Sequence, residues 1–179
     1  MIASLPPPPG ERFNFAQHLL ERNRTRAGKA AYIDDQGILS YGELDERVRR
    51  MASALVAKGL RREERVLLLM HDNNDWPVAF LGALYAGIVP VAVNTLLSGD
   101  DYAYILSHCR AQAALVSPAL LPVLEKAMAQ APHEVKFTWA SPLNAEIAGH
   151  EPMAASAPTR CDDIAFWLYT SGSTGKPKG

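Results

Sequence analysis

The chain has few cysteines and no excess of positive charge, and both shortages argue against whole classes of protein. Cys109 and Cys161 are the only cysteines among 179 residues, and they match no metal-binding spacing. We therefore do not expect a secreted scaffold held together by disulfides. We expect a reducing, cytoplasmic location. Eighteen Lys and Arg against nineteen Asp and Glu leave a formal charge of −1, so the basic footprint of a nucleic-acid-binding protein is missing.

Long hydrophobic segments are also scarce. Trp76–Val93 carries no charge over 18 residues, but Gly87 and Pro90 interrupt it, and acidic residues flank it where a membrane span has Lys or Arg. We expect a short buried helix to about residue 86 and a buried strand through residue 93, with no membrane partner. Residues 1–10 have neither a basic nor an apolar region, so no signal peptide is expected.

Apolar residues make up 48% of the chain, and their spacing alternates between strand and helix patterns. This alternation predicts an α/β fold, a mostly parallel, doubly wound sheet with helices on both faces. The expected helices span about 14–24, 40–58, 75–86, 98–109 and 121–130, and the expected strands 30–34, 38–40, 65–70, 88–93, 113–116, 135–139 and 164–170.

Serines mark two of these helix starts. Ser40 precedes Glu43, and Ser98 precedes Asp101, at the capping-box spacing. Along the first of these helices, three acid–arginine pairs four residues apart predict a solvated face of ion pairs rather than a binding patch. The pairs are Glu43/Arg47, Asp45/Arg49 and Glu46/Arg50.

The chain divides into four predicted parts. Residues 1–10 are a Pro-rich lead-in, and 11–139 form the α/β subdomain. Residues 140–163, with recurring prolines, are predicted to be a surface connection. Residues 164–179 hold a strand and the loop that follows it.

Hydroxyl, glycine and lysine residues are concentrated in that loop, directly after the apolar run. Glycines let successive N–H groups face one anion, hydroxyls donate to phosphate oxygens, and lysines neutralise charge. The loop is no Walker A motif, because Thr170 and Pro177 occupy positions that require glycine and a hydroxyl. We interpret it as a phosphate-binding loop; the alternative is a flexible tail.

The residues YTSGSTGKPKG resemble the phosphate-binding signature of the AMP-forming adenylating superfamily. The resemblance continues upstream in LSYGELDERVRRMASAL and in RVLLLMHDNNDWPVAFLGALYAGIVPVAVN. Within the superfamily, VPVAVNTLLSGDDYAYIL and AALVS are most similar to benzoate-CoA ligases. The fold implied is the N-terminal part of the large domain of an adenylate-forming ligase.

The resemblance implies that a carboxylate attacks ATP to give an acyl-adenylate and pyrophosphate, and that CoA then displaces AMP. ATP, Mg²⁺, CoA and an aromatic carboxylate are the implied cofactors and partners, and a homo-oligomer is compatible with it. Lys178 would balance charge on the departing pyrophosphate, and Lys176 would support it. The residues implied to cradle the β- and γ-phosphates are Thr170, Ser171, Gly172, Ser173, Thr174 and Gly175.

The family's acyl pocket, adenine site, metal-binding acid and C-terminal lysine are expected after Gly179. We therefore expect this chain to be a fragment, inactive alone. Three alternatives stay open at this point: a ligase for another aryl or fatty acid, an adenylation module that loads a carrier protein, and a non-catalytic anion-binding domain.

Other chemistry-bearing residues predict structure rather than catalysis. The five histidines show no ligand spacing, so no metal site is expected. The Asp pairs at 34–35, 100–101 and 162–163 are expected at turns and helix starts. Trp76, Trp139 and Trp167 are expected in the core.

Overall fold

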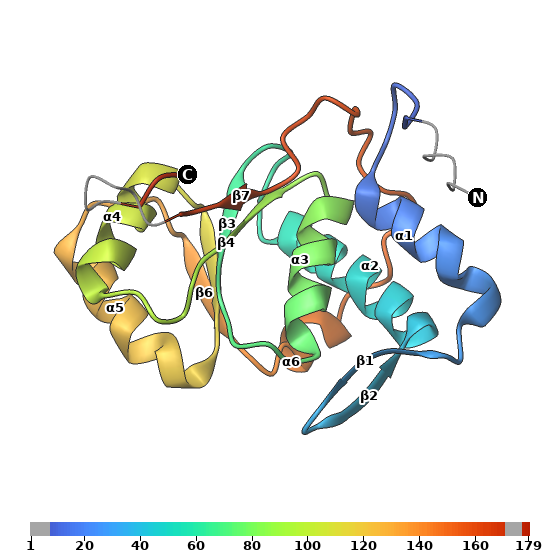
Figure 1. Cartoon of the computed structure of the whole chain (residues 1–179), viewed down its shortest axis with the longest axis horizontal. Helices are drawn as coiled ribbons and strands as arrows, with labels where there is room; N and C mark the ends of the chain where they lie inside the picture. Colours follow the sequence, from blue (N-terminus) through green and yellow to red (C-terminus); the bar gives the residue numbers. More distant parts are fainter. Residues whose placement is uncertain (1–7, 171–176) are drawn as a thin grey trace, which may run out of the picture.

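Strands and helices alternate along the chain and build a sheet with helices on both faces (Figure 1). The computed structural model describes residues 8–170 and 177–179. Its strands are β1 (Ala30–Asp34), β2 (Gly37–Ser40), β3 (Arg65–Leu69), β4 (Val89–Ala92), β5 (Ala113–Val116), β6 (Phe137–Ala140) and β7 (Trp167–Leu168). Its α-helices are α1 (Phe15–Asn23), α2 (Tyr41–Ala57), α3 (Asp75–Tyr85), α4 (Gly99–Cys109), α5 (Leu121–Gln130) and α6 (Asn144–Ala148), and short 3-10 turns occur at Arg24–Arg26 and Pro118–Leu120.

Five strands form a wholly parallel sheet in the order β6-β5-β3-β4-β7, while β1 and β2 form a separate antiparallel hairpin. Central β3 is buried on both faces, as a continuous apolar strand should be. Val66 and Leu68 join the core beneath α1, α2, α3 and α6, whereas Leu67 and Leu69 join the core beneath α4 and α5. The predicted doubly wound α/β fold is confirmed.

Local signals set the helix starts as predicted. In both capping boxes the serine hydroxyl accepts a bond from the backbone three residues on, and the acid accepts one from the serine N–H. Asn14 caps α1 by accepting from Gln17 N at 3.1 Å. Each bond satisfies an N–H group that the first helical turn leaves without a partner.

The last strand is shorter than predicted. The apolar run suggested a strand over 164–170, but only Trp167–Leu168 pairs with β4. Val89 and Val93 donate their N–H groups to residues on the β3 side. Because the backbone nitrogens of successive residues in a strand face opposite neighbours, the nitrogen of Pro90 faces β7. Proline has no N–H to donate, and the ladder to β7 begins only at Val91.

One predicted ion pair on α2 is wrong. Glu43 is occupied by the capping box, since its carboxylate accepts from Ser40 N at 2.8 Å. Arg47 instead pairs with Asp75 at the start of α3. The other two predicted pairs are confirmed, at 3.1 Å for Asp45/Arg49 and 2.9 Å for Glu46/Arg50.

The connection over 140–163 is not simply a surface segment, which corrects the prediction. It contains α6, and Leu143 and Ile147 are buried against α2 and the rest of that core. Arg49 also donates to the carbonyls of Met153 and Ala154 at 3.2 Å each. Its guanidinium thus supplies hydrogen bonds to carbonyls that lie outside any helix or strand.

The uncharged run Trp76–Val93 forms α3 and β4, as expected. No helix in the described part of the chain is long and apolar enough to cross a membrane. Trp139 is buried, whereas Trp76 and Trp167 are half-buried at the edges of the two cores.

Gly82 lets α3 approach α2 closely. A methyl carbon at this position would lie 2.6 Å from Met51 Cβ and also against Met51 Cγ. We expect Gly82→Ala to lower the free energy of unfolding by about 1–3 kcal/mol because of overpacking, although alanine is the better helix former. Urea unfolding measures this change.

Gly99→Ala is the matched control. Gly99 opens α4, and its nearest neighbour to an added methyl is Val123 Cγ2 at 4.0 Å. This substitution should be neutral or stabilising. Equal destabilisation by both variants would show that close helix approach is not the cause.

Candidate functional site

The predicted phosphate loop follows β7 at the carboxyl edge of the parallel sheet. Its two ends lie side by side, because Thr170 N donates to Lys178 O at 2.9 Å and Lys178 N donates to Thr170 O at 3.0 Å. In an antiparallel pair that exchanges both bonds, the two side chains share one face. The structure therefore brings together Thr170 and Lys178, and both are exposed. The remaining predicted loop residues, Ser171, Gly172, Ser173, Thr174, Gly175 and Lys176, lie outside the described residues.

The surroundings of the loop match the usual place of ligands in open α/β sheets. After β3 the chain turns to α3 on one face of the sheet, and after β4 it turns to α4 on the other face (Figure 1). Such a change of direction opens a crevice at the carboxyl ends of the strands. Because β7 is hydrogen-bonded to β4, the loop begins beside the point where the connections change direction.

Sequence reasoning missed two residues at the base of the loop, Tyr169 and His108. The Tyr169 hydroxyl lies 2.6 Å from His108 Nδ1 on α4. Burial raises the pKa of the Tyr169 phenol, with smaller contributions from Cys109 and Tyr104. Tyr169 stood inside the quoted motif, but 61 residues separate it from His108, and no spacing rule could pair them.

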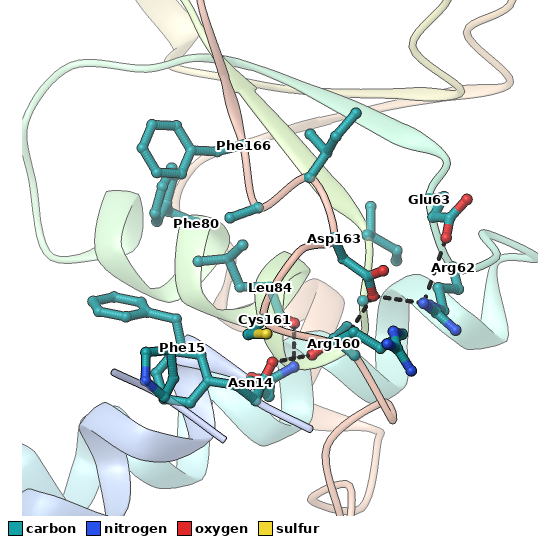
Figure 2. Close-up of a pocket in the computed structure, with 17 residues that line it drawn as sticks. Asn14, Phe15, Arg62, Glu63, Phe80, Leu84, Arg160, Cys161, Asp163 and Phe166 are labelled. Carbon is teal, nitrogen blue, oxygen red and sulfur yellow. Dashed lines mark hydrogen bonds and ion pairs between the residues drawn. The ribbon is translucent and has the colours of Figure 1, made fainter. Parts of the chain in front are cut away.

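A separate pocket of about 270 Å³ lies between α1, α3 and the segment before β7 (Figure 2). Phe15, Phe80 and Phe166 line one side of it, and Arg62 and Asp163 lie on the other. Sequence analysis did not foresee this pocket, since its walls come from segments that lie far apart along the chain.

The polar groups of this pocket already have partners within the chain. Arg62 Nη2 donates to Asp163 Oδ2 at 2.5 Å, and Asn14 Nδ2 donates to Leu84 O at 2.8 Å. The backbone N–H of Arg160, together with Arg62, lowers the pKa of the Asp163 carboxyl. The pocket therefore offers an apolar wall rather than free donors for a phosphate.

Acidic residues serve turns and caps, as predicted. Asp34 Oδ1 accepts from Gln36 N and Gly37 N, Asp101 closes a capping box, and Asp163 accepts from Arg160 N. Across residues 8–170 and 177–179, no group of three or more His, Cys, Asp or Glu could hold a metal ion.

Comparison with known proteins adds an independent finding. A family model described as AMP-binding enzyme matches residues 19–179. Benzoate--CoA ligase of Thauera aromatica is 45% identical over 177 residues, which cover 94% of this chain and 34% of that protein. 4-Hydroxybenzoate--CoA/benzoate--CoA ligase of Rhodopseudomonas palustris is 40% identical and covers 93% of this chain and 33% of its own length.

A solved structure agrees with these relatives. A benzoate CoA ligase from Burkholderia xenovorans superposes with a TM-score of 0.86 at 50% identity, covering 93% of this chain and 34% of that one. The chain thus spans about a third of the length of the curated relatives that it matches.

Proposed function

We propose, because this chain belongs to the AMP-binding enzyme family, that it forms the N-terminal part of an ATP-dependent aryl-CoA ligase acting on benzoate. The observation that carries the substrate is the identity of 40–50%, over nearly the whole chain, to relatives whose names include benzoate. One of these names also includes 4-hydroxybenzoate, so a ring-hydroxylated benzoate is the second candidate.

The proposed reaction has two steps. A benzoate carboxylate attacks the α-phosphate of ATP, forming benzoyl-adenylate and releasing pyrophosphate. The thiol of CoA then attacks the acyl carbon, and AMP leaves. In such phosphoryl and acyl transfers the protein contributes mainly positioning and electrostatic stabilisation.

This chain would supply the phosphate-handling part of the site. Thr170 and the loop residues Ser171–Gly175 would donate hydrogen bonds to the β- and γ-phosphates. Lys178 would neutralise charge that develops on the leaving pyrophosphate. The pairing of Thr170 with Lys178 supports this assignment, since it places a hydroxyl and a cation on one face of the loop base.

Mg²⁺ would enter with ATP as part of the substrate. The described residues hold no group of three or more His, Cys, Asp or Glu that could bind a resident metal ion. A cytoplasmic location and a homo-oligomer stay predictions.

Substrate competition in the full-length protein tests this proposal. We expect kcat/KM for benzoate or 4-hydroxybenzoate to exceed that for acetate or a medium-chain fatty acid by on the order of 100-fold or more, because neither aliphatic acid fills a slot shaped for an aryl ring. ATP–pyrophosphate exchange and CoA-thioester formation are both measured.

Each other outcome points to a different function. A preference for either aliphatic acid would overturn the aryl assignment. Exchange without thioester formation, together with acyl transfer to a carrier protein, would identify an adenylation module. Nucleotide binding without exchange would leave only an anion-binding domain.

A further inference from the structure

Tyr169 connects the base of the loop to α4. Its backbone immediately precedes Thr170, while its hydroxyl lies 2.6 Å from His108 Nδ1. Because burial raises the pKa of this phenol, the hydroxyl keeps its proton at neutral pH. It can therefore donate the hydrogen bond to His108 Nδ1 in the tautomer that carries the ring proton on Nε2.

The same tyrosine also contacts the far end of the loop. A methyl group at Gly179 would lie 2.8 Å from Tyr169 Cζ, so the backbone of Gly179 lies directly against the tyrosine ring. Gly179 follows Lys178, which is paired with Thr170. One side chain thus contacts both strands of the loop base.

His108 is itself held by rings on two sides. Tyr104, one turn earlier on α4, stacks on it with a centroid distance of 5.6 Å and an interplanar angle of 22°. Trp167 of β7 lies tilted at 6.3 Å, and the guanidinium of Arg65 lies 5.8 Å from the Trp167 ring centroid. These contacts restrict the imidazole, and a restricted acceptor can orient its donor.

We infer that His108 and Tyr169 are positioning residues, which hold the base of the phosphate loop against α4 so that Thr170 and Lys178 face the nucleotide phosphates. This inference rests on the proposed function for its kinetic consequence, but the positioning itself is a property of the fold. Neither side chain is among those proposed to contact the phosphates. They act through the backbone pair that follows Tyr169.

Four variants of the full-length protein separate the parts of this arrangement. Tyr169→Phe removes the hydroxyl and keeps the ring against Gly179, and His108→Ala removes the acceptor. His108→Asn retains an acceptor, Oδ1, at the same number of bonds from the backbone as Nδ1. His18→Ala is the control, because this exposed histidine lies on α1 and contacts Phe13 instead.

Hydrogen exchange, followed by mass spectrometry, reports on positioning without requiring activity. We expect the amides of Thr170 and Lys178, which bond to each other's carbonyls, to exchange about 5- to 10-fold faster in Tyr169→Phe and His108→Ala. Exchange in His108→Asn and His18→Ala should match the unmodified protein.

Kinetics report on the consequence. In ATP–pyrophosphate exchange, Tyr169→Phe and His108→Ala should lower kcat on the order of 10- to 100-fold, with little change in KM for benzoate. His108→Asn, which keeps an acceptor, should retain most of the kcat that His108→Ala loses. The double variant that combines Tyr169→Phe and His108→Ala should lose hardly more kcat than either single variant, since both substitutions break the same hydrogen bond.

Different results would overturn the two proposals separately. Unchanged amide exchange in Tyr169→Phe and His108→Ala would overturn the positioning role, whatever the activity. Absence of benzoate-dependent exchange in the unmodified protein would overturn the proposed function, and amide exchange would still decide the positioning role. A loss in His108→Asn as large as in His108→Ala would also contradict the hydrogen bond as the cause.

Discussion

Lys178→Ala is expected to slow ATP–pyrophosphate exchange in the full-length protein by about 30- to 1000-fold, which corresponds to about 2–4 kcal/mol of transition-state stabilisation. The lysine is exposed and paired through its backbone with Thr170. Removing its side chain therefore removes a cation but no buried packing. Thr174→Ala, at a loop position predicted to donate to phosphate, should slow exchange in the same range.

Comparing the loss of turnover with the loss of AMP affinity in Lys178→Ala identifies the role of the lysine. If its partner is the leaving pyrophosphate, turnover should fall more than affinity for AMP, because AMP lacks the phosphates that the lysine would contact. The melting temperature of Lys178→Ala should stay close to that of the unmodified protein. Lys126→Ala, an exposed lysine of α5, is the control and should leave exchange unchanged. Normal exchange in both loop variants would mean that the loop is only a connection.

Asp75→Ala is expected to lower the free energy of unfolding of the chain by about 3–5 kcal/mol. Asp75 is 7% exposed and has two partners from distant segments. Its Oδ1 pairs with Arg47 of α2, and its Oδ2 accepts from Leu143 N at 2.9 Å. The alanine would leave the partly buried guanidinium of Arg47 and the buried N–H of Leu143 without their acceptor.

Two further variants test this explanation. Asp75→Asn keeps an oxygen that can accept from Leu143 N but loses the charge, so its cost should be smaller. Glu46→Ala breaks an exposed pair on the same helix α2 and should cost about 0.5 kcal/mol or less. Urea unfolding followed by circular dichroism measures all three. If Asp75→Ala cost no more than Glu46→Ala, the link between α2, α3 and the segment before α6 would contribute little.

Local sequence determined most of the elements and their order. The predicted bounds 113–116 and 121–130 are those of β5 and α5, and both serine capping boxes form as their spacing indicates. These features depend on neighbours within four residues, which the sequence shows directly. The loop after β7 could be predicted to bind phosphate for the same reason, because its hydroxyls, glycines and lysines are contiguous; that role stays a prediction.

Tertiary structure decided which side chains meet across the chain. On α2, the spacing allowed Glu43 either to form a capping box with Ser40 or to pair with Arg47. Only the approach of α3 gave Arg47 its partner in Asp75. The shortness of β7 depends on the side toward which Pro90 of β4 turns its nitrogen. His108 and Tyr169 become neighbours because α4 and β7 lie on adjoining parts of one core. Contacts of this kind depend on the packing of whole elements, and no local pattern in the sequence encodes them.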